Sequence, residues 1–127
     1  LCVGETIQER EGGRLFDVLA RQIRGALEPL SGGVQRELVY AYEPVWAIGT
    51  GHTATPSDAS QAHAIVREVV AEIVDADNAA AVTILYGGSV KPGNIKELIT
   101  ASGVDGVLVG GASLDPESWA SICDCGR

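Results

Sequence analysis

The sequence predicts an α/β fold built from four βα units with parallel strands. Short apolar runs at residues 1–3, 38–41, 82–85 and 106–109 alternate with longer segments that have helical patterning. The runs lack a regular apolar–polar alternation, which is typical of strands covered on both faces. Strands that alternate with helices pair in parallel through right-handed crossovers. Because no linker or low-complexity segment separates them, residues 1–127 are predicted to form a single α/β region.

Start and end signals along the chain predict four helices. Residues 15–27 repeat apolar side chains on a helical period. The next helix begins at Thr55, with Pro56 in the first helical position and Asp58 in the capping-box position. The remaining two helices are predicted to start at Pro92 and at Asp115-Pro116.

The composition excludes several classes of partner. The chain has 127 residues and a formal net charge of −8, which argues against nucleic acid and anionic membrane surfaces. No apolar run approaches ~18 residues, so no membrane-spanning segment is predicted. The pair Cys123 and Cys125 lacks a second pair of zinc ligands, and Cys2 stands alone. We therefore expect no metal, no cofactor and a reducing, cytoplasmic environment.

The strongest chemical signal lies at residues 42–51, Tyr-Glu-Pro-Val-Trp-Ala-Ile-Gly-Thr-Gly. Pro44 keeps the preceding Glu43 out of the helical region, so the carboxylate is expected to project from the end of a strand. Gly49 and Gly51 allow the following loop to move or to approach a ligand closely. A carboxylate beside a loop that can close suits proton abstraction from carbon, because water must be excluded from the intermediate.

Two later strand ends carry similar glycine pairs. Their sequences are Tyr86-Gly87-Gly88-Ser89 and Val109-Gly110-Gly111-Ala112-Ser113. Backbone N–H groups of such segments can converge on an anion at the carboxyl ends of parallel strands. Either pair alone is a weak signal, since glycine pairs also form ordinary turns. Both pairs, following the carboxylate in order, predict a phosphate site.

These segments, together with Cys2-Val3-Gly4-Glu5-Thr6, resemble the C-terminal half of the triosephosphate isomerase family in order and spacing. The resemblance covers almost the whole chain. It implies half of a (β/α)8 barrel and an enzyme that interconverts dihydroxyacetone phosphate and D-glyceraldehyde 3-phosphate, small phosphorylated trioses. It also implies that Glu43 is the base and that residues 44–54 form a lid. The substrate phosphate would be held by Gly49, Ser89, Gly110 and Gly111.

The resemblance is to only part of the family's active site. A complete barrel has roughly 250 residues, and the family's N-terminal half supplies a lysine, an electrophilic histidine and most of a homodimer interface. No residues here match those motifs, so this chain alone is expected to have negligible isomerase activity. A start without Met, inside a motif, favours a piece of a longer protein. The alternative hypothesis is an inactive phosphate-binding module that self-associates through open sheet edges.

Three further residues are predicted to have structural rather than catalytic roles. Glu5 is predicted to be a structural partner rather than a second catalytic acid. His63 stands between Ala62 and Ala64 on a predicted helix and is expected at the surface. Cys2 is expected to be a buried, small apolar residue near the site.

Overall fold

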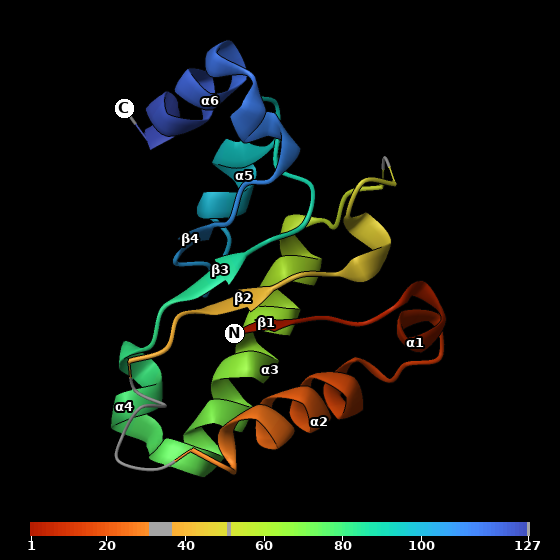
Figure 1. The fold of residues 1–127 in the computed structure, drawn as a ribbon, viewed down its shortest axis with the longest axis vertical. Helices are drawn as coiled ribbons and strands as arrows, with labels where there is room; N and C mark the ends of the chain where they lie inside the picture. The colour runs from red at the N-terminus through yellow and green to blue at the C-terminus, as the bar shows by residue number, and fades with distance from the viewer. Residues whose placement is uncertain (31–36, 51, 127) are drawn as a thin grey trace.

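The computed structural model describes residues 1–30, 37–50 and 52–126. It contains a four-stranded parallel sheet with helices packed against one side (Figure 1). The strands are β1 (Cys2–Val3), β2 (Tyr40–Tyr42), β3 (Ile84–Tyr86) and β4 (Gly106–Val107). The α-helices are α1 (Ile7–Glu11), α2 (Leu15–Leu27), α3 (Pro56–Val74), α4 (Ala76–Ala81), α5 (Ile95–Ile99) and α6 (Pro116–Cys123). Short 3-10 helices are η2 (Val45–Ala47), η3 (Gly111–Leu114) and η4 (Asp124–Gly126).

The strands lie side by side in chain order, β1-β2-β3-β4, and every neighbouring pair is parallel. At least one helix connects each strand to the next and brings the chain back to the end of the sheet where the strands begin, as the predicted βα alternation requires. The carboxyl ends of the strands therefore meet on one edge. This confirms the predicted fold class, four parallel βα units arranged as in half of a (β/α)8 barrel.

The strands are shorter than the apolar runs that predict them. β2 begins at Tyr40 rather than at residue 38, and its ladder to β3 starts with the pair Tyr40↔Ile84. β4 ends at Val107 rather than at residue 109. Side chains are apolar wherever the rest of the chain covers them, whether or not their backbone pairs. A strand extends only as far as a neighbouring strand lies beside it to form hydrogen bonds. Because β2 ends at Tyr42, Glu43 directly follows the strand.

The helices agree with the local signals more closely. The helix α2 has the predicted bounds. At the start of α3, the Thr55 side chain accepts a hydrogen bond from the Asp58 N–H, and the Thr55 N–H donates to the Asp58 carboxylate at 2.8 Å. The helix α5 begins at Ile95, three residues after Pro92. The helices α1 and α4 are additional to those predicted.

The core lies between the sheet and the helices α2 and α3. Tyr40, Tyr42 and Tyr86 are fully buried on this side, together with Leu19 and Ile23 from α2. Figure 1 shows α3 behind the strands and α2 below β1, with the lid segment and α1 at the carboxyl edge of the sheet. The rigid layer therefore supports the strand ends from which the candidate site residues project.

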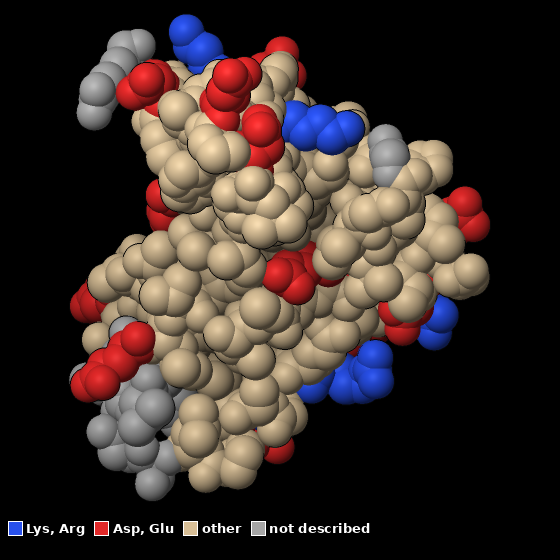
Figure 2. All heavy atoms as spheres, turned by 45° about the horizontal axis from the view of Figure 1, so that its top comes forward, with Lys and Arg blue, Asp and Glu red and all other residues tan. Residues whose placement is uncertain are grey.

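No helix of the described residues covers the opposite face of the sheet in Figure 1. Figure 2 shows a broad area with few charges across the face turned to the viewer, with acidic atoms near its centre and most charged side chains around its periphery. Within the described residues, no helix is long and apolar enough to cross a membrane. The same residues contain no group of three or more His, Cys, Asp or Glu side chains placed to hold a metal ion.

Candidate active site

Glu43 lies at the carboxyl edge of the sheet, between the ends of β1 and β3. Its backbone N–H donates to the Val3 carbonyl oxygen of β1 at 2.7 Å. Its half-buried side chain crosses to the end of β3, where a Cβ added to Gly87 would lie 2.6 Å from the Glu43 Cγ and 3.1 Å from Oε1. Among the described residues, the carboxylate has no hydrogen-bond or ion-pair partner. It is therefore placed at the strand ends without being neutralised by the chain.

Glycines are required around this residue because the backbone and side chains approach so closely. A Cβ on Gly4 would lie 1.8 Å from the Glu43 carbonyl oxygen, and one on Gly88 would lie 2.2 Å from the Tyr86 hydroxyl oxygen. The Gly87 N–H donates to the Tyr42 carbonyl oxygen at 2.8 Å, so it is already used within the chain. Gly87 and Gly88 therefore make room for neighbouring groups, and both also line the cavity described next.

The four predicted phosphate-binding residues line a single cavity of about 380 Å³ beside Glu43. Gly49 comes from the lid, Ser89 from the loop after β3, and Gly110 and Gly111 from the loop after β4. Ile48 lines both this cavity and a neighbouring one of about 200 Å³ that includes Glu43. Three loops far apart in sequence thus converge next to the carboxylate.

Lys91 also lines the larger cavity, and the sequence interpretation did not include it. Its backbone N–H donates to the Asn94 Oδ1 at 2.8 Å, and the Asn94 Nδ2 donates to the Ser89 carbonyl oxygen at 3.0 Å. In the loop after β4, the Ser113 hydroxyl donates to the Gly110 carbonyl oxygen at 2.7 Å. A Cβ on Gly110 or Gly111 would meet nothing within 4 Å, so the backbone there faces open space.

The lid begins at η2 and is anchored through Trp46 to a buried carboxylate. The indole Nε1 donates to the Glu5 Oε1 at 2.8 Å, and the Tyr42 hydroxyl donates to the same oxygen at 2.9 Å. Glu5 is fully buried, in the structural role that the sequence predicts. Burial and the neighbouring Glu5 carboxylate raise the pKa of Tyr42 well above its ordinary value, so the hydroxyl remains a donor.

Arg10 extends this anchor from α1 to the start of α3. Its guanidinium donates to Glu5 at 3.2 Å, forms an ion pair with Asp58 and lies over the Trp46 ring, 5.0 Å from the centroid. Burial alone would raise the pKa of Asp58, but hydrogen bonds from Thr55 and the charge of Arg10 lower it. The first residues of the lid are therefore held by groups from three elements.

The tip of the lid has fewer contacts. Gly49 adopts a φ of +68°, which favours glycine, and a Cβ there would meet nothing within 4 Å. The Thr50 hydroxyl donates to the Trp46 carbonyl oxygen at 2.6 Å. Gly51, also assigned to the tip, lies outside the described residues. The well-anchored start and the exposed tip are compatible with a segment that closes over the cavity.

Two sequence expectations near the site are wrong. His63 is buried, with 1% of its surface exposed, and its ring packs edge-on against Tyr42 at a centroid distance of 6.2 Å. Its four-residue spacing from buried Ala59 was the signal for an inward position. Cys2 is exposed and lines the smaller cavity with Glu43. Alternation along β1 explains this, because Val3 occupies the covered face of the sheet.

The sequence matches the triosephosphate isomerase family over residues 1–126. The chain belongs to the triosephosphate isomerase family. It is 53% identical over 122 residues to the triosephosphate isomerase of Syntrophotalea carbinolica, covering 96% of this chain and 48% of that protein. The corresponding protein of Moorella thermoacetica is 54% identical over 122 residues, with 96% and 49% covered. That of Geotalea uraniireducens is 50% identical over 121 residues, with 95% and 48% covered.

The chain therefore spans about half the length of the curated relatives it matches. This agrees with a four-stranded sheet in a family whose barrels have eight strands. Among the described residues that line the two cavities, none is a histidine and Lys91 is the one lysine. The chain supplies a carboxylate next to a cavity lined by three loops, and the resemblance places the electrophile in the other half of the family's barrel.

Proposed function

We propose that residues 1–127 act as one α/β unit that forms the base, lid and phosphate-binding half of a triosephosphate isomerase. The complete enzyme would interconvert dihydroxyacetone phosphate and D-glyceraldehyde 3-phosphate. The observation that carries this proposal is the convergence of Gly49, Ser89, Gly110 and Gly111 on one cavity beside Glu43. Family membership over residues 1–126 supports it.

In this mechanism Glu43 moves a proton between the two adjacent carbons of the triose. The half-buried carboxylate projects past the strand end and has no partner in the described chain, so its oxygens are available to a substrate. The N–H groups of Gly49, Gly110 and Gly111 and the Ser89 hydroxyl would hold the phosphate. With the phosphate fixed, the reacting carbons lie at a constant distance from Glu43.

The lid would exclude water while the enediolate is present. Its anchored start at Trp46 and its exposed Gly49 suit a segment that changes conformation at the tip. An electrophile must also stabilise the charge that develops on the substrate oxygen. Because that group is expected from the other half of the barrel, we infer that this chain alone has negligible isomerase activity.

The remaining assignments follow from family membership and composition. We infer a cytoplasmic glycolytic and gluconeogenic enzyme that forms a homodimer, takes a small phosphorylated triose and requires no cofactor. With a net charge of −8, the chain is unsuited to nucleic acid or an anionic membrane surface.

A second candidate function is an inactive phosphate-binding module that self-associates. The observation in its favour is the sheet itself, because β1 and β4 are its edges among the described residues and one face carries exposed apolar side chains. This candidate predicts phosphate binding without turnover, even when the other half of the barrel is supplied.

A chimera separates the two candidates. In this chimera, residues 1–127 replace the half of the Syntrophotalea carbinolica protein that they match. The other half of that protein is kept. We expect isomerase activity in a coupled assay of the chimera and negligible activity from the chain alone. A folded chimera without activity would favour the inactive module, and turnover by the isolated chain would refute the half-site account.

A further inference from the structure

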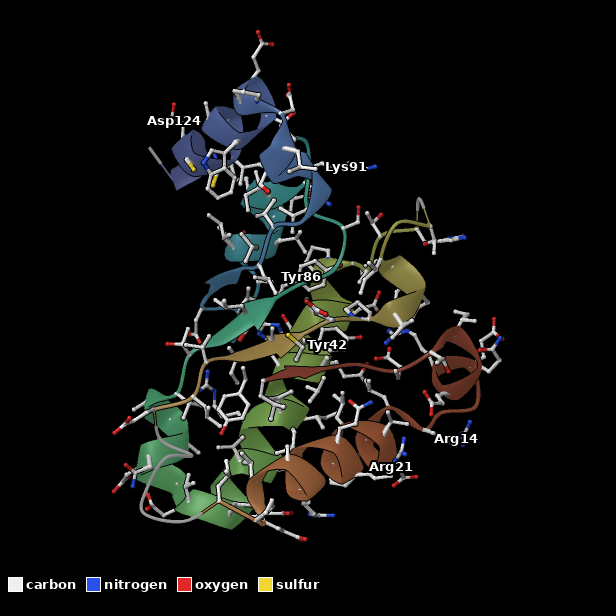
Figure 3. The ribbon with its side chains drawn as sticks, in the orientation of Figure 1. Arg14, Arg21, Tyr42, Tyr86, Lys91 and Asp124 are labelled. Carbon is white, nitrogen blue, oxygen red and sulfur yellow. The ribbon has the colours of Figure 1, made fainter. Side chains whose placement is uncertain are left out.

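We propose that Lys91 is the cationic group that draws the substrate phosphate into the cavity beside Glu43 and strengthens its binding there. The inference rests on the function proposed above and adds a residue that determines specificity for a charged substrate. Lys91 is the one charged side chain among the described residues that line this cavity. Figure 3 shows it projecting from the loop after β3 toward the side of the molecule where the lid lies.

The net charge of the chain favours such a group on this side of the site. The formal net charge is −8, and the carboxylate of Glu43 lies next to the cavity against Gly87. A phosphate dianion therefore approaches a predominantly negative molecule, and glycine N–H groups supply only partial positive charge. Within the Debye length, where salt screens charges only weakly, a nearby ammonium group offsets this repulsion.

Two other cations in the described part of the chain are engaged elsewhere. Arg10 pairs with Glu5 and Asp58 beneath the lid, and Arg67 pairs with Asp105 at 2.9 Å. The Lys91 ammonium has no ion-pair partner among the described residues. Its side chain is exposed and therefore accessible to an anion.

The backbone of Lys91 is held in place by Asn94. The Asn94 side chain accepts from the Lys91 N–H at 2.8 Å and donates to the Ser89 carbonyl oxygen at 3.0 Å. The N–H groups of Asn94 and Ile95 both donate to the Lys91 carbonyl oxygen at 3.1 Å. One amide thus connects the predicted phosphate ligand Ser89 to the lysine, so both are presented to the same cavity.

The test is a titration of the full chain with inorganic phosphate, in which binding is measured by calorimetry or by amide chemical shifts. It is repeated at about 0.01 M and about 0.15 M ionic strength, where the Debye length is roughly 30 and 8 Å. We expect Lys91→Gln to weaken phosphate binding roughly two- to fivefold at low salt, the size of one exposed charge interaction. Phosphate binding by Lys91→Gln should also depend less on salt than binding by the parent chain. Lys91→Arg should keep most of the parent's affinity for phosphate.

Lys96→Gln is the matched control, because it removes the same charge from an exposed position on α5 that does not line the cavity. Unchanged binding in Lys96→Gln and weaker binding in Lys91→Gln support the proposal. Equal losses in both variants would show a net-charge effect and overturn it.

Gly111→Val separates failure of this inference from failure of the proposed function. If it abolishes phosphate binding while Lys91→Gln binds like the parent chain, the phosphate site stands and the role of Lys91 is refuted. If the parent chain itself binds no phosphate, the phosphate site and the role of Lys91 both fail.

Discussion

At the scale of single residues, the position of Glu43 depends on glycines that leave space for it. Gly4 admits its carbonyl oxygen and Gly87 admits its side chain, both at distances that a Cβ would not allow. The Val3 carbonyl oxygen fixes its backbone N–H. The carboxylate is thus directed by close packing, and the surrounding side chains form no hydrogen bonds to it within the described part of the chain.

Gly87→Ala should therefore displace the carboxylate without removing it. The new Cβ would lie 2.6 Å from the Glu43 Cγ, so that side chain must shift. Misplacement of about 1 Å can cost on the order of 100-fold in rate. We expect kcat of the chimera to fall by roughly 10- to 100-fold.

Gly93→Ala is the control for Gly87→Ala, because a Cβ at position 93 meets nothing within 4 Å. Its kcat should remain close to that of the parent chimera. Full activity in Gly87→Ala would show that the Glu43 position does not depend on this contact.

The sequence predicted that Glu43 and the cavity-lining Gly49, Gly110 and Gly111 lie at the same edge of the sheet, because their signals are local. Pro44 fixes the backbone before it, and the glycine pairs directly follow apolar strands. It missed the close approaches of Gly4 to Glu43 and of Gly88 to the Tyr86 hydroxyl, and the place of Lys91, because these depend on how the strands pack and on the shape of a cavity. Contacts of this kind appear only when the strands are assembled.

At the scale of elements, the helices were more predictable than the strands. The bounds of α2 and the cap of α3 follow from neighbouring residues alone. The bounds of β2 and β4 depend on where adjacent strands can pair, so the apolar runs overestimated them. The burial of His63 was missed for a related reason, since it faces Tyr42 of β2 and the Gly103 carbonyl oxygen.

His63 should make the packing of α3 sensitive to pH. Burial is the main cause that lowers its pKa, although the bond to Gly103 and the charge of Asp105 oppose this and Arg67 adds to it. The neutral ring is therefore favoured in the folded chain. Its contribution to the free energy of unfolding is fully present above the ordinary histidine pKa of about 6.5 and is lost as pH falls from there through the lower folded pKa.

Urea unfolding across this pH range measures the effect. We expect His63→Gln to lose less stability than the parent chain when pH falls from about 7.5 to about 5. The exposed His52, the second histidine of the chain, provides the control, and His52→Gln should keep the parent's pH dependence. The same pH dependence in His63→Gln and the parent would rule out this role.

At the scale of the whole molecule, the sheet has one covered face and one face with exposed apolar side chains. Val39 directly precedes β2; it is 49% exposed and lies on the face opposite the buried Tyr40. The same argument places Leu108, 40% exposed, opposite the side on which Val107 packs against the core. In an eight-stranded barrel this face would be the closed interior.

The isolated chain is therefore expected to associate in solution. Size-exclusion chromatography with light scattering should give a mass above that of one chain, and the double variant Val39→Asp, Leu108→Asp should shift it toward the monomer. Phe16→Asp, on the exposed side of α2, should leave the association unchanged. A strictly monomeric parent chain would contradict this prediction.

The central claim is that Glu43 is the base of an isomerase site whose other half lies outside this chain. The most direct measurement compares kcat and KM of the active chimera with those of its Glu43→Gln variant, which keeps the size of the side chain but removes its basicity. We expect kcat to fall by about 10²- to 10⁴-fold, with KM changed only a few-fold. A Glu43→Gln chimera that retains the parent kcat would contradict it.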